Sequence, residues 1–170
     1  GMLKYLRRCR NLYFTPSIIA SDDIEEALAA YPSQQIRVVY QTGGSSYWYQ
    51  DISDDRLERF VLENGELQKV DERPNANMGD AGTLSEFLIW GVQHYPAERM
   101  GVILWDHGSG SINGVCFDEQ YEYDSLGVTE MAAAFDRVYD SMTDRFEFIG
   151  FDACLMSTLE VANQLVPYAR

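Results

Sequence analysis

Residues 101–110 read GVILWDHGSG, and this stretch decides the fold class. Its first part, GVILWD from Gly101 to Asp106, is a continuous apolar run with no alternation of polar and apolar side chains. Such a run is typical of a central parallel strand that is covered on both faces. A second strand is predicted at Phe146–Asp152, which reads FEFIGFD.

Helical patterns precede, separate and follow these two strands. MGDAGTLSEFLIWGVQHYP keeps helical spacing of its apolar residues, with Thr83 and Glu86 in a predicted capping box. TEMAAAFDRVYDSM predicts a helix capped by Thr129, and LMSTLEVANQLV predicts another after the second strand. The order helix, strand, helix, strand, helix indicates an α/β fold: a mostly parallel sheet with helices on both faces, in three αβα layers.

The chain before residue 80 predicts shorter elements. Residues 22–31 (DDIEEALAAY) predict a helix with Ser21 as N-cap, and residues 36–41 (IRVVYQ) predict a strand. RLERFVLENGELQKV predicts a hairpin around Asn64-Gly65, and a small hairpin is expected within residues 108–124. Since the sequence has no repeat or linker, a single domain is expected.

Composition excludes several classes of function. The 170 residues are 46% hydrophobic and 13% aromatic, as in a folded globule, and the net charge is −14. This charge argues against nucleic-acid binding and favours cationic partners. No apolar run approaches the length of a membrane span, and no signal peptide is visible at the N-terminus. Three cysteines, Cys9, Cys116 and Cys154, cannot all pair with one another, and their spacing does not indicate zinc.

The two predicted strands end in residues that suggest chemistry. One ends in Asp106-His107-Gly108 and the other in Asp152-Ala153-Cys154. In parallel α/β sheets the functional site gathers at the carboxyl ends of the strands. Cys154, at an expected strand-to-helix turn, could be an activated thiolate, with the helix N-terminus lowering its pKa. The alternative is a buried, inert core thiol.

A nucleophilic cysteine also needs an acid–base group and donors for the oxyanion. His107 is the predicted proton donor to the leaving amine and the base for the deacylating water. The main-chain amides of Gly108 and Cys154 could form the oxyanion hole. His107 lies 47 residues before Cys154, close to the spacing of about 50 in caspase-type peptidases.

Four segments carry a resemblance to a known family. NMGDAGTLSEFLIWGVQHYP, GVILWDHGSG, GVCFDEQYEYDSLGVTEM and FIGFDACLMSTLEVANQL resemble, in the same order, segments of the clostripain-like cysteine peptidases. The resemblance implies a caspase-like fold, a His107–Cys154 catalytic dyad, and cleavage after Arg or Lys with Asp152 in an acidic substrate pocket. It also allows calcium, with the acidic loop at residues 118–124 as a candidate, and a secreted or cell-envelope location.

The chain departs from the family pattern at both ends. The segment LKYLRRCRNLYFTP stands where the family has an apolar first strand, and the family continues beyond the position of Arg170. The resemblance therefore implies one caspase-like domain over residues 2–170, incomplete at the C-terminus and with a degraded first strand. It also leaves open an inactive, truncated domain that acts as a binding module. Missing strands would favour self-association or docking of a complementary C-terminal chain.

Overall fold

The computed structural model describes residues 22, 24–26, 28–29, 36–48, 51–63, 65–142 and 144–170. The predictions for Cys9, Ser21 and the N-terminal stretch lie outside these residues. The described residues among 22–29 are helical. The remaining elements are β1 (Val38–Thr42), β2 (Arg56–Glu63), β3 (Glu66–Pro74), α2 (Ala81–His94), β4 (Gly101–Trp105), α3 (Gly110–Asn113), β5 (Val115–Asp118), β6 (Asp124–Leu126), α4 (Val128–Tyr139), β7 (Phe148–Asp152) and α5 (Leu159–Leu165), with a 3₁₀ turn at Glu119–Tyr121.

Strands β1, β2 and β3 form an antiparallel sheet in that order. The hairpin predicted around Asn64-Gly65 is confirmed, because Glu63 pairs with Glu66 across the turn. Gly65 has φ of +79°, a conformation that glycine adopts without strain. A bulge between Arg59 and Phe60 shifts the register of the hairpin.

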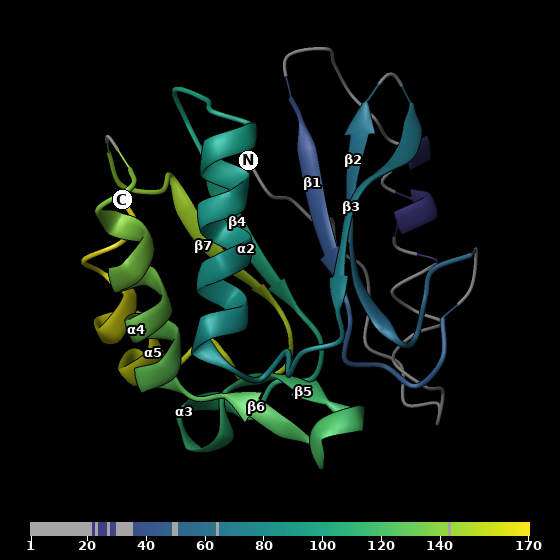
Figure 1. Cartoon of the computed structure of the whole chain (residues 1–170). Helices are drawn as coiled ribbons and strands as arrows, with labels where there is room; N and C mark the ends of the chain where they lie inside the picture. Colours follow the sequence, from purple (N-terminus) through teal and green to yellow (C-terminus); the bar gives the residue numbers. More distant parts are fainter. Residues whose placement is uncertain are drawn as a thin grey trace.

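Strands β4 and β7 form the predicted parallel pair, with Gly101 opposite Phe148 and Trp105 opposite Asp152. The connection between them contains the β5–β6 hairpin and α4, so the crossover that parallel strands require is present. Strands β4 and β7 thus form a two-stranded parallel sheet, whereas the sheet of β1, β2 and β3 is antiparallel. Figure 1 shows β1, β4 and β7 running in the same direction, with α2 in front of β4 and β7.

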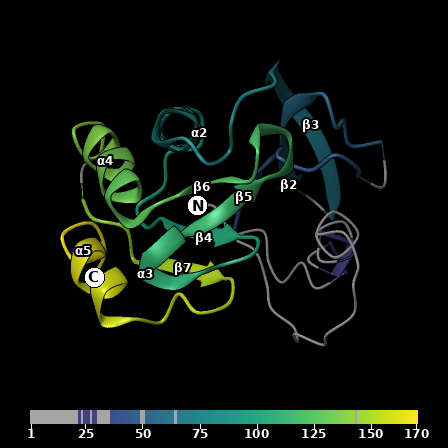
Figure 2. The ribbon, with the colours of Figure 1, turned by 90° about the horizontal axis from the view of Figure 1, so that it is seen from below.

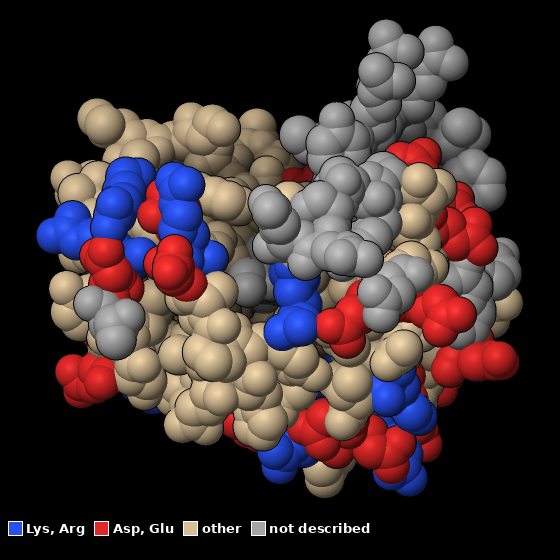
Figure 3. All heavy atoms as spheres, turned by 90° about the horizontal axis from the view of Figure 1, so that it is seen from above, with Lys and Arg blue, Asp and Glu red and all other residues tan. Residues whose placement is uncertain are grey.

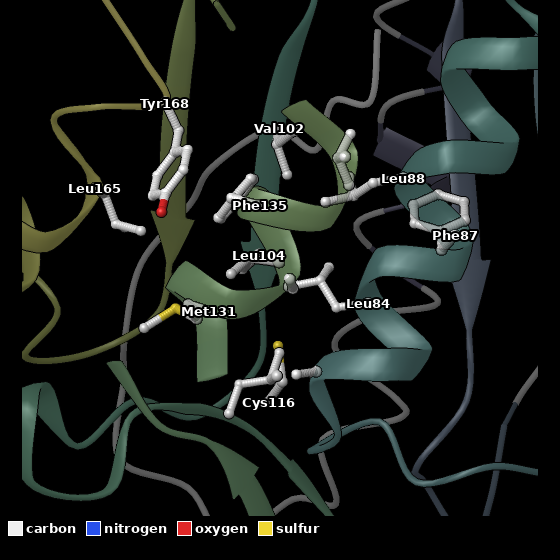
Figure 4. Close-up of a cluster of buried hydrophobic side chains, with 14 of the residues drawn as sticks. Leu84, Phe87, Leu88, Val102, Leu104, Cys116, Met131, Phe135, Leu165 and Tyr168 are labelled. Atoms are coloured by element: carbon white, nitrogen blue, oxygen red, sulfur yellow. The ribbon is translucent and has the colours of Figure 1, made fainter. Parts of the chain in front are cut away.

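Strands β1 and β2 are buried on both faces, and the side chains of the two faces belong to different hydrophobic clusters. Val39 and Val61 belong to the core that contains α2, α4 and α5, whereas Val38 and Tyr40 pack with Ile24 of the first helical segment. Because neighbouring strand residues point to opposite faces, β1 lies between two helical layers. In the main core, Leu84 and Leu88 of α2 extend toward the side of Val102, Leu104 and Phe135 (Figure 4). These contacts confirm the α/β class and the three layers.

The starts of three helices differ from their predictions. Helix α2 begins at Ala81, and Asp80, not Thr83, is its N-cap: the Asp80 carboxylate accepts the N–H groups of Gly82 and Thr83 at 2.7 and 3.2 Å. Helix α4 begins at Val128, behind Gly127. Thr83 and Thr129, the predicted caps of α2 and α4, both lie within the first turn of their helices. Helix α5 begins only at Leu159, capped by Thr158.

Opposite charges lie together on the surface despite the net charge of −14. On the face seen from above, Lys and Arg atoms lie next to Asp and Glu atoms instead of forming a field of one sign (Figure 3). Three of the ion pairs join Arg37 to Glu63, Arg99 to Glu147 and Arg170 to Asp144. None of the helices in the described ranges has the length and apolar content needed to cross a membrane.

Candidate functional site

The carboxyl ends of β4 and β7 bring the two predicted segments together. The register places Trp105 opposite Asp152, and the N–H of Asp106 lies 3.4 Å from the carbonyl oxygen of Asp152, so the pairing extends to the last strand residues. Figure 2 views this edge of the molecule from below, with α3, β5 and β6 in front of β4 and β7. The segments 106–108 and 152–154 therefore leave the sheet side by side.

Gly108 lies directly against the turn that carries Cys154. A Cβ atom at position 108 would lie 2.2 Å from the carbonyl oxygen of Cys154, 2.9 Å from Met156 Cγ and 3.0 Å from Ala153 Cβ. Real Cβ atoms do not approach backbone oxygen so closely, so this position has room only for glycine. The close approach requires the glycine after His107, and it joins the histidine segment to the cysteine segment.

A second glycine contact reinforces the first. Gly110, with φ of +66°, begins helix α3, and a Cβ there would lie 3.1 Å from the carbonyl oxygen of Leu155. Leu155 itself has φ of +61°, an uncommon conformation for a branched residue. Backbone strain of this kind clusters at functional sites. The loop after His107 and the turn of Cys154 thus pack together through their main chains.

Both predicted catalytic side chains are exposed. Cys154 is exposed in the turn after β7, and His107 is exposed at the end of β4. The reading of Cys154 as a buried core thiol is therefore wrong. Cys116 is the buried cysteine of the described part, at 8% exposure in β5, where burial raises the pKa of its thiol.

One argument for an activated Cys154 is wrong. Cys154 lies in a turn, and α5 begins at Leu159, five residues later, so the cysteine is not at the first turn of a helix. The dipole effect on a neighbouring charge is confined to the terminal turn of a helix.

The main chain around His107 is held on two sides. The carbonyl oxygen of His107 accepts the N–H of Cys116 at 3.3 Å, and Gly108 forms a bridge to Val115. Ser109 donates its N–H to the carbonyl oxygen of Gly114 at 2.8 Å. Strand β5 therefore fixes the loop from one side, while the Cys154 turn fixes it from the other.

Asp106 was not singled out as a functional residue from the sequence. Its carboxyl is largely buried and accepts the N–H groups of His107 and Phe117. Burial raises the pKa of Asp106 to about 6, and the nearby Glu119 adds to the rise. In the sequence, the only indication of a role for Asp106 is its position between the apolar run and His107. Asp106 positions the main chain of His107 and the start of the following strand.

The free energy of unfolding should depend on pH through the titration of Asp106. Because its pKa is raised from 3.8 to about 6, the folded chain keeps this proton between about pH 4 and pH 6, where the unfolded chain loses it. The unfolding free energy contributed by this group therefore falls as pH rises through that window. Asp106→Asn should gain stability relative to the wild type between pH 4 and pH 7.5, by about 2–3 kcal/mol.

Urea unfolding at both pH values measures this difference. Asp140→Asn, an exposed carboxyl at the end of α4, is the matched control and should show no such gain. A stability difference between wild type and Asp106→Asn that is the same at pH 4 and pH 7.5 would rule out this titration.

The acidic loop at residues 118–124 uses its carboxylates for internal contacts. Asp118 is fully buried and accepts the N–H groups of Met78 and Gln120 at 2.8 and 2.9 Å. Glu119 accepts the hydroxyl of Ser46 at 2.7 Å, and Asp124 accepts an Asn77 amide N–H. No group of three or more His, Cys, Asp and Glu residues suited to a metal ion occurs in the described part of the chain.

The residues that meet at this edge match a known family. The model described as "Peptidase_C11: Clostripain family" matches residues 15–170. The chain belongs to the clostripain family. Clostripain from Hathewaya histolytica is 28% identical over 139 residues, which cover 69% of this chain and 26% of the length of that relative.

Solved structures of the family share the fold. A secreted C11 cysteine protease from Bacteroides thetaiotaomicron, "iotapain", superposes with a TM-score of 0.67 at 17% identity, covering 89% of this chain and 45% of that chain. A secreted C11 cysteine protease of the same organism, in complex with an irreversible peptide inhibitor, gives a TM-score of 0.69 at 21% identity, with 90% and 43% coverage. The chain thus spans less than half the length of these relatives, and the caspase-like fold is shared.

Proposed function

We propose that this chain is a cysteine endopeptidase domain that cleaves peptide bonds after Arg or Lys, with His107 and Cys154 as its catalytic dyad. The observation that carries the proposal is the joining of the two strand ends by the contact between Gly108 and the Cys154 carbonyl, with both reactive side chains exposed. Membership of the clostripain family supports it. A peptide-inhibitor complex of a C11 relative supports a peptide as the substrate.

Acylation would use both members of the dyad. The Cys154 sulfur, as thiolate, attacks the scissile carbonyl carbon and forms a tetrahedral intermediate. The carbon–nitrogen bond then breaks, and His107 gives its proton to the departing amine. The products of this step are a thioester on Cys154 and the released amine half of the substrate.

Deacylation would return the enzyme to its starting state. His107, now neutral, takes a proton from a water molecule whose oxygen attacks the thioester carbonyl. The carbon–sulfur bond breaks, and the acid half of the substrate leaves. The amides of Gly108 and Cys154 would stabilise the oxyanion in both steps. Thiol and imidazole suffice for this chemistry, so no step requires a metal, and a calcium effect would act outside the dyad.

Asp152 is the proposed determinant of basic specificity. It is the last residue of β7, half-buried, two positions before Cys154. A carboxylate at the floor of a substrate pocket can bind an arginine guanidinium through two parallel hydrogen bonds, and it can pair with a lysine ammonium as a point charge. The acidic net charge of the chain also attracts basic substrates over longer range.

Fluorogenic peptides that differ only in the residue before the cleaved bond test this specificity. Arg and Lys substrates should be cleaved with a kcat/KM at least about 100-fold above that of the Ala substrate. Asp152→Asn should lower kcat/KM for the Arg substrate by about 10–100-fold, mainly through KM, because one partner of a charged pair is lost. Asp140→Asn changes an exposed carboxyl and is the control. It should leave kcat/KM and KM for the Arg substrate unchanged. Equal cleavage of Arg and Ala substrates would exclude the proposed specificity.

The competing proposal, an inactive binding module, remains distinguishable. In that case the purified chain would bind basic peptides without cleaving them. Turnover that depends on Cys154 would exclude this alternative.

A further inference from the structure

The three most exposed large apolar side chains of the described residues all lie beside the turn of Cys154. Ile112 of α3 is 86% exposed, Leu159 at the start of α5 is 82% exposed, and Leu155, directly after Cys154, is 72% exposed. Together they are the apolar rim of this turn. Single exposed apolar residues are common on protein surfaces, but several gathered beside one site mark a binding surface.

Helix α3 brings the apolar rim together by packing on the turn after β7 and on α5. A Cβ atom at Gly110, the first residue of α3, would lie 4.0 Å from Leu155 Cβ and 3.6 Å from Thr158 Cγ2. Ile112 follows Gly110 by two residues, and Leu159 follows Thr158 directly. Both views of the ribbon show α3 next to α5 (Figure 1 and Figure 2). Each rim residue therefore lies within two positions of this one contact.

The main chain of Leu155 does not favour leucine. Its φ of +61° is a left-handed conformation, which Gly and Asn adopt more readily than other residues do. The side chain adds little to the hydrophobic core, because most of it is exposed. Folding alone therefore does not explain a leucine at this position, and strained residues of this kind gather at functional sites. The side chain is available to an incoming molecule.

The apolar rim lies where the amine half of a substrate would leave. In the proposed mechanism His107 protonates the departing amine, so the residue after the cleaved bond lies against the His107 segment. That segment leads through Gly108 into α3 within three residues. Asp152, the proposed partner of the basic residue before the cleaved bond, precedes Cys154, whereas Leu155 follows it. The two sides of the cleaved bond therefore meet different chemistry.

We propose that the apolar rim binds a large apolar side chain of the substrate at the position directly after the cleaved bond. This inference rests on the proposed peptidase function and adds a second specificity to it. The preferred substrate is a peptide with Arg or Lys followed by Leu, Ile or Phe. Because the rim is open on the surface, it buries only part of that side chain, and the expected preference is about tenfold.

Two peptides of identical composition test this preference and its position. Ala-Ser-Arg-Leu-Gly-Ala places Leu after the cleaved bond, and Ala-Leu-Arg-Ser-Gly-Ala places it before the Arg. When equal amounts compete in one reaction with the wild-type chain, mass spectrometry of the products gives the ratio of the two kcat/KM values. The first peptide should be cleaved about tenfold faster than the second.

Substitutions in the apolar rim should remove the preference and leave the chain folded. The triple variant Ile112→Ser, Leu155→Asn and Leu159→Ser should bring the ratio of the two kcat/KM values to about one. Val166→Ser, which changes another exposed apolar residue at the end of α5, is the matched control and should keep the ratio. Leu155→Asn alone should not lower the melting temperature, because Asn adopts the left-handed conformation readily.

Binding to Cys154→Ala separates this inference from the proposed function. Fluorescein-labelled forms of the two peptides should bind this variant with Kd values that differ about tenfold. If the wild type cleaves neither peptide and this difference in Kd remains, the peptidase function is rejected and the rim is supported as a peptide-binding surface.

Three results would overturn the role of the apolar rim. Equal cleavage of the two peptides by an active wild type would do so and leave the peptidase function standing. A preference that survives the triple variant, or a Leu155→Asn chain that unfolds, would show that the rim side chains serve another purpose. Absence of both cleavage and binding would overturn the rim and the peptidase function together.

Discussion

Replacing Cys154 by alanine is expected to abolish cleavage of an Arg-containing fluorogenic peptide, with kcat falling at least about 1,000-fold. In the proposed mechanism the Cys154 sulfur forms the covalent intermediate, so alanine removes the nucleophile. Ser157→Ala is the matched control, because Ser157 is an exposed residue three positions later in the chain. Its kcat should stay within about twofold of the wild type.

The two histidines of the chain form a second matched pair. His107→Gln should lose activity on the scale of Cys154→Ala, because proton transfer to the leaving amine fails, and the double variant should be no worse than either single one. His94 is exposed at the end of α2, where its Nδ1 lies 2.9 Å from the Trp90 carbonyl oxygen. His94→Gln should keep full activity. Wild-type turnover in His107→Gln would remove His107 from the mechanism.

Gly108→Ala is expected to damage both activity and stability. The added methyl would lie 2.2 Å from the Cys154 carbonyl oxygen, so one of the two segments must move. A displacement of about 1 Å at a catalytic group costs about 100-fold in rate, and overpacking costs about 1–3 kcal/mol of unfolding free energy. Peptide turnover and urea unfolding measure the two effects.

Gly91→Ala is the matched control for that substitution. Gly91 lies inside α2, and a Cβ there meets no atom within 4 Å. Alanine is favoured over glycine in a helix by about 0.5–1 kcal/mol, so the control should raise the melting temperature by about 2–4 °C and leave activity unchanged. If Gly108→Ala behaved like Gly91→Ala, the contact between Gly108 and the Cys154 turn would not matter for the site.

The sequence predicts the central layers of the fold because their signals are local. The apolar run at β4, the Asn64-Gly65 turn and the helical spacing of α2 each determine one element, and all three are present. Helix starts were harder to predict. Asp80 and Thr83 are both good caps, and the choice between them depends on where the preceding loop leaves β3, which no local pattern contains.

The sequence predicts where the candidate site lies in the fold, but it predicts neither the turn after Cys154 nor the role of Asp106. The rule that parallel strands end at one edge brought His107 and Cys154 together from sequence. The sequence does not predict the turn between Cys154 and α5, because residues 155–158 continue the helical pattern, whereas the turn packs against Gly108 and Gly110 of a loop far away in the sequence. The sequence does not indicate the role of Asp106. That role follows from the burial of its carboxyl and from its hydrogen bond to the main-chain N–H of Phe117 in β5.

Covalent labelling tests most directly whether Cys154 is the nucleophile of a peptidase that is specific for basic residues. The wild-type chain is treated with an irreversible peptide inhibitor that carries Arg next to its reactive group, and the modified residue is mapped by mass spectrometry. We expect a single adduct on Cys154. This adduct should not form in His107→Gln, and excess Arg substrate should prevent it in the wild type. A chain that takes up no label, or that is labelled equally by the matching Asp-containing inhibitor, would contradict the assignment of a basic-specific cysteine peptidase.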